Sequence, residues 1–263
     1  MNTTPLDTLW IAVRMQTASS RHWHLADLAN HQQRYLADHK LVESLQPAGS
    51  ILEVGAAPCH MTALLSLSGR TVVGVDLDPS RVDGLIQQLG LKVLPCDIER
   101  QALPFADGEF GCVMLCETFE HLRIDPAFVL SEIHRVTAPG GCLLLTTPNV
   151  YSLPSLARFL LGRSVADPAS EFGKLRGLGH MGHVREYSAA EVSRFLHKSG
   201  FSVQSVDYRY HAIGGGLRHR LLQLAYRVAP RRFRRELVVV ARKAAQGPRL
   251  QPLVPLLPAA AAP

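Results

Sequence analysis

Two glutamates and a histidine follow directly on the apolar run GCVMLC, at Glu117, Glu120 and His121. At a spacing of i, i+3 and i+4, these side chains would share one face of a helical turn. An imidazole titrates near neutral pH and can take a proton from a hydroxyl group, and a neighbouring carboxylate can orient its ring. A second imidazole, His183, lies much later in the segment GHMGHVREYS. The residue types therefore predict general-base chemistry, with His121 or His183 as the base and Glu117 as the orienting group; the structural alternative for His121 is to cap the following helix.

Three further acids stand at the ends of earlier apolar segments, Glu53 in ILEVGAAP, Asp76 in TVVGVDLDP and Asp97 in LPCDIE. In an open parallel sheet, ligands bind beyond the carboxyl ends of the strands, so these acids would border one crevice. A dinucleotide site needs G-x-G-x-x-G to hold a pyrophosphate, and the chain lacks it. Glu53, two residues before Gly55, would repel a diphosphate but suits a turn that receives a cationic methionine group. The pattern therefore indicates an adenosine ligand other than a dinucleotide.

Alternating strand and helix patterns must position these residues. Strands are predicted near residues 51–55, 71–76, 91–95, 110–116, 142–147, 201–208 and 236–242. The alternation predicts an α/β fold, with a Rossmann-like, doubly wound, mostly parallel seven-stranded sheet and helices on both faces. Pro139, Gly140 and Gly141 are predicted as the turn that leads into the fifth strand.

The chain divides into three predicted regions. Residues 1–46 form an N-terminal helical cap, residues 47–243 the main domain, and residues 244–263 a disordered tail rich in proline and alanine. The cap contains several histidines that we expect on its solvent-exposed polar face, namely His22, His24, His31 and His39. No functional role is predicted for these histidines or for His60, which is expected in a loop.

Five segments together carry a resemblance to a known family: ILEVGAAP, VVGVDLDP, CDIERQALPFADGEFGCVMLCETFEHL, EIHRVTAPGGCLLLTTPN and GHVREYSAAEVSRFLHKSGF. In this order and spacing the chain resembles the class I S-adenosylmethionine-dependent methyltransferases, of the bacterial small-molecule and glycan type, from about residue 45 to residue 243. The resemblance also implies that residues 150–186, which interrupt the alternation, form a lid over the substrate.

The resemblance implies roles for individual positions. The Gly55 turn would face the amino-acid end of the cofactor, Asp76 would accept hydrogen bonds from the ribose hydroxyls, and Asp97 with Ile98 would border the adenine. The positions implied to contact the cofactor are Glu53, Gly55, Ala57, Asp76, Leu77, Asp97, Ile98 and Cys116. For Glu117, the alternative role is to position the amino group of the cofactor. The chain departs from the family where Ala57 and Cys59 stand in place of glycines.

A second resemblance concerns metal. The pattern E-x-x-E-H, followed downstream by H-x-x-E-aromatic-S/T, is similar to that of metal-assisted O-methyltransferases, including quinone-precursor and small-RNA terminal 2′-O enzymes. This implies a site for one divalent ion such as Mg²⁺ at Glu117, Glu120, His121 and His183. A bound cation lowers the pKa of a coordinated hydroxyl group, which helps the oxygen to attack a methyl group. The alternative is a metal-free site in which an imidazole removes the proton.

The positive charge of the chain is local. The net charge is +6, yet residues 213–250 contain ten Lys or Arg and the single acid Glu236. Within this region, residues 213–235 interleave leucines with arginines and predict a basic amphipathic helix that can lie on an anionic membrane surface. The alternatives are a helix that packs on the sheet with solvated arginines, or one that contacts an anionic acceptor.

Composition bounds the protein further. Among 263 residues, 47% are apolar and five are cysteines without a C-x-x-C pair, as expected for one globular domain with reduced, buried thiols. The start lacks a secretory pattern and no apolar stretch is long enough to span a membrane. We therefore expect a cytoplasmic protein, with peripheral contact at the inner face of the membrane.

The predicted reaction is transfer of the methyl group of S-adenosylmethionine to a hydroxyl oxygen of a small molecule, saccharide or glycolipid. Oxygen is favoured because the fourth strand is not followed by the Asn/Asp-Pro-Pro-aromatic sequence associated with planar nitrogen acceptors. One alternative is RNA ribose 2′-O-methylation, although aromatic residues are only 6% of the chain and nucleic acid is not an expected partner. The other is an inactive cofactor-binding regulator, because Ala57 and Cys59 alter the glycine turn.

Overall fold

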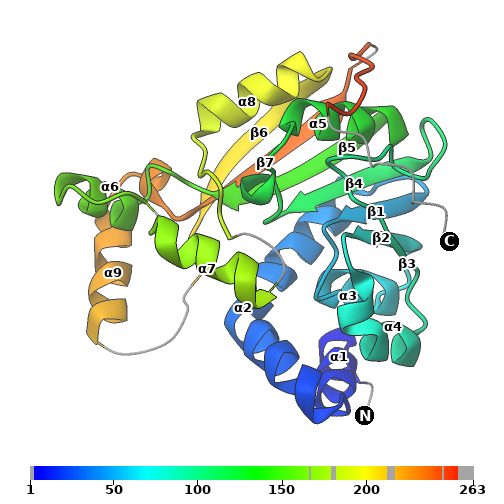
Figure 1. Ribbon diagram of the computed structural model, residues 1–263, viewed down its shortest axis with the longest axis horizontal. Coiled ribbons are helices and arrows are strands. Elements are labelled where there is room, and N and C mark those ends of the chain that lie inside the picture. Colours follow the sequence, from blue (N-terminus) through cyan, green and yellow to red (C-terminus); the bar gives the residue numbers. More distant parts are fainter. Residues whose placement is uncertain (1–2, 166, 179–181, 212–216, 245, 254–263) are drawn as a thin grey trace, which may run out of the picture.

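A computed structural model describes residues 3–165, 167–178, 182–211, 217–244 and 246–253. Its centre is a seven-stranded sheet in the order β3-β2-β1-β4-β5-β7-β6 (Figure 1). The strands are β1 (Ser50–Val54), β2 (Val72–Asp76), β3 (Val93–Pro95), β4 (Phe110–Cys116), β5 (Thr137–Pro148), β6 (Phe201–Arg209) and β7 (Glu236–Lys243). The helices are α1 (Pro5–Arg14), α2 (Ala18–Leu45), α3 (His60–Leu67), α4 (Asp83–Leu89), α5 (Pro126–Val136), α6 (Leu153–Leu160), α7 (Pro168–Leu178), α8 (Ala189–Lys198) and α9 (Leu217–Val228).

The sheet is parallel except around β7, which pairs antiparallel with both β5 and β6. The strand order reverses between β1 and β4, which are parallel neighbours. In such sheets the crevice beyond the carboxyl ends of the two strands at the reversal is where ligands bind. The predicted fold class, a doubly wound and mostly parallel sheet, is confirmed.

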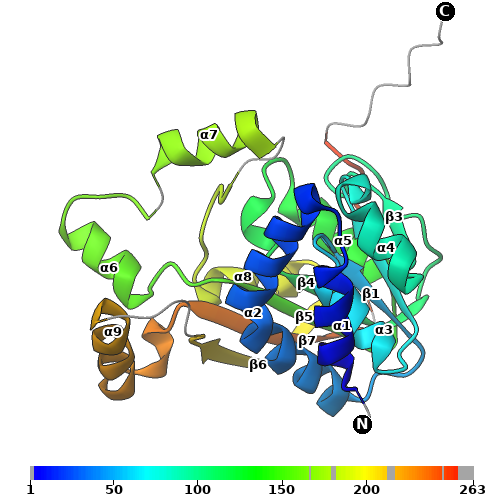
Figure 2. The same ribbon diagram turned by 90° about the horizontal axis from the view of Figure 1, so that it is seen from below.

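Side chains of β4 alternate between two apolar layers. Val113 and Leu115 pack with α5 and α8, whereas Cys112 and Met114 pack with α1, α2 and α3. Figures 1 and 2 show these two sets of helices on opposite faces of the sheet. Successive side chains of a strand point to opposite faces, so both faces of β4 are covered and the strand is apolar throughout.

Strand β5 begins earlier than the sequence pattern indicates. It starts at Thr137, so Pro139, Gly140 and Gly141 lie within the strand, and their prediction as a preceding turn was wrong. The pairing with β4 moves from Phe110 opposite Thr137 to Cys112 opposite Cys142, so extra residues of β5 bulge out between the two pairs. Gly140 has a φ of 70° in this bulge. Glycine adopts this left-handed conformation without steric cost, which explains why a turn-like sequence is accommodated inside a strand.

The N-terminal helices are part of the main body of the protein. Leu9 of α1 and Leu28 and Val42 of α2 are completely buried against α3 and the sheet. Farther along the sheet, the buried Asp38 of α2 accepts a hydrogen bond from Arg209 of β6. The cap predicted at residues 1–46 therefore shares a core with residues 47–243.

Three helices stand away from the sheet. Along the chain, helices α6 and α7 come between β5 and α8, within the predicted lid 150–186. Helix α9 belongs to the predicted basic segment 213–235 (Figure 1). The two ends of the lid lie next to each other, because the backbone N–H of Val150 donates a hydrogen bond of 3.1 Å to the carbonyl oxygen of Tyr187. Residues 166 and 179–181 of the lid and residues 213–216 of the basic segment, together with residue 212, lie outside the described residues.

The described residues beyond β7 form neither helix nor strand. Arg249 in this segment forms an ion pair with Asp107 at 2.6 Å. Residues 245 and 254–263 lie outside the described residues, so the disordered tail stays a prediction. Among the described residues, no helix is long and apolar enough to span a membrane.

Candidate functional site

An inner cavity of about 130 Å³ lies beyond the carboxyl ends of β1 and β4. Its lining comes from the turn between β1 and α3, the end of β4, and helix α2. The lining residues are Asp27, Arg34, Tyr35, Asp38, Glu53, Gly55, Ala56, Ala57, Pro58, His60, Met61, Cys116 and Glu117. Four of the predicted cofactor residues, Glu53, Gly55, Ala57 and Cys116, thus meet in one cavity.

The turn at Gly55 requires glycine. Its φ is 76°, and a Cβ atom there would lie 2.3 Å from Oγ1 of Thr118. Cys59, where the family usually has glycine, is buried and also left-handed, with a φ of 65°. The turn therefore keeps a glycine-like backbone at Cys59, and Thr118 packs closely against Gly55.

Glu53 is the buried acid of the inner cavity. Only 6% of its surface is exposed, and its carboxylate accepts a hydrogen bond from the Thr62 hydroxyl. Burial raises the pKa of Glu53 to about 8, although the bond from Thr62 acts in the opposite direction. Glu53 is therefore mostly protonated at neutral pH until a cation enters the cavity.

Asp76 holds together the two turns at the sheet edge. Its Oδ2 accepts from the backbone of Ala57 at 2.9 Å, and its Oδ1 accepts from the backbone of Asp78 at 3.1 Å. Arg81 Nη2 lies 3.3 Å from the same Oδ1. A carboxylate has about four acceptor positions, so these contacts leave capacity for a ribose hydroxyl.

The other predicted cofactor residues lie on the loops after β2 and β3. Leu77 is 54% exposed, and Ile98 is partly buried against the apolar core. Asp97 accepts from the backbone of Glu99 at 3.2 Å. Together with Asp76, these residues line neither the inner cavity nor the larger one beside it. Their contacts with the cofactor stay predictions.

Replacing Asp76 with alanine is expected to weaken cofactor binding by about tenfold or more, because charge-assisted hydrogen bonds to the ribose and the anchor of the Ala57 turn are both lost. Calorimetric titration with S-adenosylmethionine measures the change. Asp78→Ala, which removes an exposed carboxylate two residues farther along the chain, is the matched control. Unchanged affinity in a folded Asp76→Ala protein would remove Asp76 from the cofactor site.

An outer cavity of about 760 Å³ adjoins the inner one and shares Arg34 and Glu117 with it. Its walls come from the end of β4, the lid, helix α2, and the residues flanking β6 and β7. The charged and imidazole side chains that line it are His31, Arg34, Glu117, Glu120, His121, Arg158, Arg163, His183, Glu186, Arg209, His211, Arg235 and Glu236. The predicted catalytic residues therefore face a space large enough for an acceptor.

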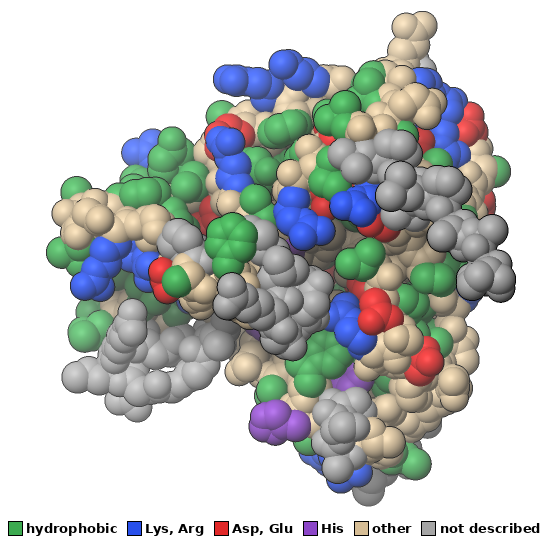
Figure 3. Space-filling model, in the orientation of Figure 1, with side chains coloured by type: hydrophobic (Ala, Val, Ile, Leu, Met, Phe, Trp, Pro, Cys, Tyr) green, Lys and Arg blue, Asp and Glu red, His purple; other side chains and the backbone are tan. Residues whose placement is uncertain are grey.

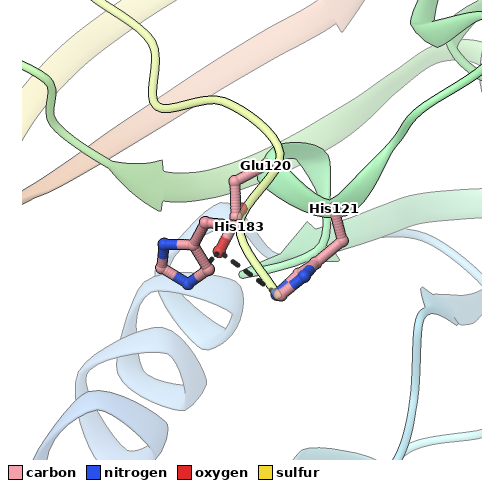
Figure 4. A group of neighbouring side chains, drawn as sticks. All are labelled: Glu120, His121 and His183. Carbon is pink, nitrogen blue, oxygen red and sulfur yellow. Dashed lines mark ion pairs between the residues drawn. The ribbon is translucent and has the colours of Figure 1, made fainter. Parts of the chain in front are cut away.

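Glu120, His121 and His183 form a tight group in this cavity (Figure 4). The Nε2 atoms of His121 and His183 lie 3.9 and 4.0 Å from Oε1 of Glu120. Glu120 is 1% exposed; its Oε2 accepts from the Thr147 hydroxyl at 2.9 Å, whereas its Oε1 is buried without a hydrogen-bond partner. Burial, and then the charge of Glu117, raise the pKa of Glu120 well above its usual range.

The remaining ring nitrogens have orienting contacts. His121 Nδ1 lies 3.1 Å from the carbonyl oxygen of Gly182, which can only accept, so Nδ1 carries a proton. His183 Nδ1 lies 3.7 Å from Oε1 of Glu186. A buried oxygen without a hydrogen-bond partner that faces two imidazoles, one of them oriented by a hydrogen bond through its other nitrogen, fits a divalent metal site. Two imidazoles and one carboxylate suit a transition metal better than Mg²⁺.

Glu117 is separate from this group. Its φ is 51°, and its Oε2 forms an ion pair with Arg34 at 3.1 Å, while its Oε1 accepts from the Thr146 hydroxyl at 3.2 Å. Three of the four residues predicted to hold a metal, Glu120, His121 and His183, therefore lie together, whereas the Glu117 side chain contacts Arg34 of α2 instead. Glu117 instead stands where the inner and outer cavities meet.

The sequence analysis predicted the N-terminal helical cap but named none of the α2 residues that line the inner cavity. Asp27, Arg34 and Asp38 line the inner cavity from one face of this helix. Their spacing of seven and then four residues is that of a single helical face, and this was the available signal.

The histidine predictions also need correction. His24, expected on a solvent-exposed face, is completely buried, and its Nδ1 lies 3.0 Å from Nε2 of His60. His60, expected in a loop, begins α3 and contacts Asp27 at 3.0 Å. His31 lines the outer cavity. Packing of α2 against α3 buries His24 and His60, which local polarity did not indicate.

Comparisons with known proteins agree on a common chemistry. The profile of a methyltransferase domain matches residues 28–206. A Mycolicibacterium smegmatis protein described as a probable S-adenosylmethionine-dependent methyltransferase is 29% identical over 167 residues, covering 62% of this chain and 56% of that protein. A malonyl-[acyl-carrier protein] O-methyltransferase of Erwinia billingiae is 29% identical over 140 residues, with coverages of 50% and 52%. A ubiquinone/menaquinone biosynthesis C-methyltransferase of Desulfotalea psychrophila is 29% identical over 185 residues, with coverages of 64% and 70%.

A crystal structure of an S-adenosylmethionine-dependent methyltransferase from Thermotoga maritima has the same fold. It superimposes with a TM-score of 0.55 at 18% identity, covering 89% of this chain and 99% of that one. The chain spans a little over half the length of the first two relatives above. The similarity therefore concerns the fold and the type of reaction, while the acceptors named for these relatives are chemically different.

Proposed function

The chain belongs to the class I S-adenosylmethionine-dependent methyltransferases, and from this premise we propose that it methylates a hydroxyl oxygen of a small molecule or saccharide, including the sugar of a glycolipid. S-adenosylmethionine is its cofactor. The proposal concerns the acceptor and the residues that act on it.

The junction of the two cavities carries the proposal. Arg34 and Glu117 line both cavities, so a methyl group at the outer end of the inner cavity would face an acceptor in the outer one. His121 and His183 line only the outer cavity, on the acceptor side of this junction. Such an arrangement suits an acceptor that must lose a proton as it takes the methyl group.

The chemistry follows from the tautomer of His121. With its proton on Nδ1, the ring presents Nε2 as an acceptor. In the proposed step, the acceptor oxygen attacks the methyl carbon in line with the sulfur, the carbon–sulfur bond breaks, and S-adenosylhomocysteine leaves. The hydroxyl proton passes to Nε2, and the Gly182 carbonyl oxygen accepts from Nδ1–H of the resulting imidazolium.

A polar acceptor is favoured by the lining of the outer cavity. Arg163 and Arg235 have no carboxylate partner among the described residues. The Arg158 side chain donates a hydrogen bond to the carbonyl oxygen of Ser164. Guanidinium groups donate several hydrogen bonds in a fixed geometry, which suits the hydroxyl and acidic substituents of a sugar derivative. Relatives act on oxygen and on carbon, so the acceptor atom has to be tested directly.

The experiment supplies S-adenosylmethionine and a panel of sugars, sugar phosphates and phenols, and measures S-adenosylhomocysteine. Methyl signals in the product spectrum distinguish O-methyl from C-methyl groups. Formation of an O-methyl product that depends on His121 supports the proposal. A C-methyl product would replace it, and tight cofactor binding without turnover on any acceptor would favour the regulator alternative.

A divalent metal is the alternative to the imidazole base, because the same ring nitrogens cannot hold an ion and accept the hydroxyl proton. Glu120, His121 and His183 are the residues that would hold it. Such an ion, when bound, lowers the pKa of a coordinated hydroxyl group. A transition metal is expected to suit the three residues better than Mg²⁺.

If a metal is used, dialysis against a chelator is expected to abolish turnover, and Mn²⁺ to restore it better than Mg²⁺. The measurement is the initial rate of S-adenosylhomocysteine release before and after each addition. Cofactor affinity should be unchanged, because the group lies outside the inner cavity. Turnover that is indifferent to chelation would leave the imidazole as the sole base.

A further inference from the structure

Two neighbouring helices expose large apolar side chains. Leu160 and Leu161, at the end of α6, are 89% and 72% exposed, and Val228, which ends α9, is 83% exposed. Leu221 and Leu224 of α9 and Phe159 of α6 are also exposed. Both ribbon views place α6 and α9 side by side, away from the sheet (Figures 1 and 2). The two helices thus form one apolar surface, here called the α6–α9 surface.

The same segments are strongly basic. Residues 150–165 and 208–235 contain ten arginines and no Asp or Glu. The net charge of the whole chain is only +6, so the rest of the chain is acidic overall. Arg227, Arg231 and Arg232 are exposed next to the apolar residues of α9. Figure 3 shows hydrophobic and basic side chains together on the part of the molecule where α6 lies.

We propose that the α6–α9 surface docks the protein on a membrane that contains anionic lipids. Aliphatic side chains enter the boundary between headgroups and acyl chains, and arginines beside them bind the lipid phosphates. The exposed large apolar residues of the two helices are aliphatic, apart from Phe159, whereas single-stranded RNA is held mainly by aromatic side chains that stack on bases. Charge and side-chain type together favour lipid as the occupant.

The surface borders the outer cavity. Arg158 and Leu161, from α6 and the residue after it, line that cavity, as does Arg235 from the other basic segment. Docking would therefore bring the entrance of the cavity close to the lipid headgroups. An acceptor hydroxyl carried by a lipid suits this position, a consequence that rests on the proposed function, whereas docking itself does not.

Co-sedimentation with vesicles tests the proposal without any acceptor. We expect binding to vesicles of phosphatidylcholine mixed with phosphatidylglycerol, little binding to phosphatidylcholine alone, and weaker binding as salt is raised. Leu160→Glu combined with Val228→Glu should lower the partition coefficient at least tenfold. Arg227, Arg231 and Arg232 replaced together by serine should lower it by about 100-fold, since each contributes about 1 kcal/mol. Ile11→Glu, at an exposed position of α1, is the matched control and should bind as the unchanged protein does.

Circular dichroism and cofactor affinity establish that each variant is folded. No binding to either vesicle, or equal binding to both, overturns the proposal. Unchanged vesicle binding by the leucine/valine and arginine variants of α6 and α9 would also overturn the proposal. Light scattering tests self-association. If the protein does not bind vesicles but forms a dimer that Leu160→Glu dissociates, the α6–α9 surface is a dimer interface. Salt-sensitive RNA binding in place of vesicle binding would assign it to nucleic acid.

Discussion

Replacing His121 and His183 together with asparagine is expected to lower kcat for methyl transfer by about 100- to 10,000-fold, the usual contribution of general-base catalysis. Both imidazoles face the acceptor side of the junction, and neither lines the inner cavity. S-adenosylmethionine should therefore bind the variant with nearly unchanged affinity. Single-turnover rates and calorimetric titration measure the two quantities separately.

The single variants identify the base. His121→Asn should have the larger effect, because the Gly182 carbonyl oxygen holds its proton on Nδ1 and leaves Nε2 to accept. The fall of the rate at low pH, where a general base becomes protonated, should also be lost only in the variant that lacks the base. His197→Asn, at an exposed position of α8, is the matched control. Full activity in the double variant would exclude both imidazoles as the general base and leave Glu117 as the candidate.

Binding of S-adenosylmethionine at pH 7 is expected to release close to one proton from Glu53. Burial raises the pKa of this carboxyl group to about 8 in the free protein, so it is mostly neutral at pH 7. The sulfonium and ammonium groups of the cofactor favour the carboxylate and lower its pKa in the complex. Affinity should therefore rise with pH, by at most about tenfold per unit, and level off above about pH 8. Calorimetry in buffers of different ionisation enthalpy counts the released proton.

Glu53→Gln is the matched control, because the amide keeps the shape of the neutral carboxyl group. This variant should release only the protons that the cofactor itself exchanges, and its affinity should fall behind that of the unchanged protein as pH rises. Identical proton release by the two proteins would show that Glu53 does not sense the cofactor. S-adenosylhomocysteine, which lacks the sulfonium charge, should release fewer protons than S-adenosylmethionine.

Local patterns in the sequence were enough for the sheet and for the residues at the strand ends. The strands near 51–55, 71–76 and 110–116 were predicted from apolar runs, and the acids Glu53, Asp76 and Glu117 stand where those runs end. Parallel strands bring their carboxyl ends to one edge, so this short-range information also placed Glu53 and Glu117 in one cavity. Glu120 and His121 lie in one short helical segment, whereas Glu117, predicted on the same helical turn, precedes that segment with a φ of 51°.

Packing between distant segments decided the protonation state of these residues and the side chains that they contact. Arg34 reaches Glu117 because α2 packs across the sheet edge, and His183 reaches Glu120 because the backbone of its neighbour Val184 donates to the Glu120 carbonyl oxygen. The neutral form of Glu53 is likewise a consequence of burial. By itself, the sequence determined the fold and the cofactor, and it indicated candidate residues at the strand ends. Only the tertiary structure decided which of them meet and which keep a charge, because both depend on contacts between distant segments and on exclusion of water.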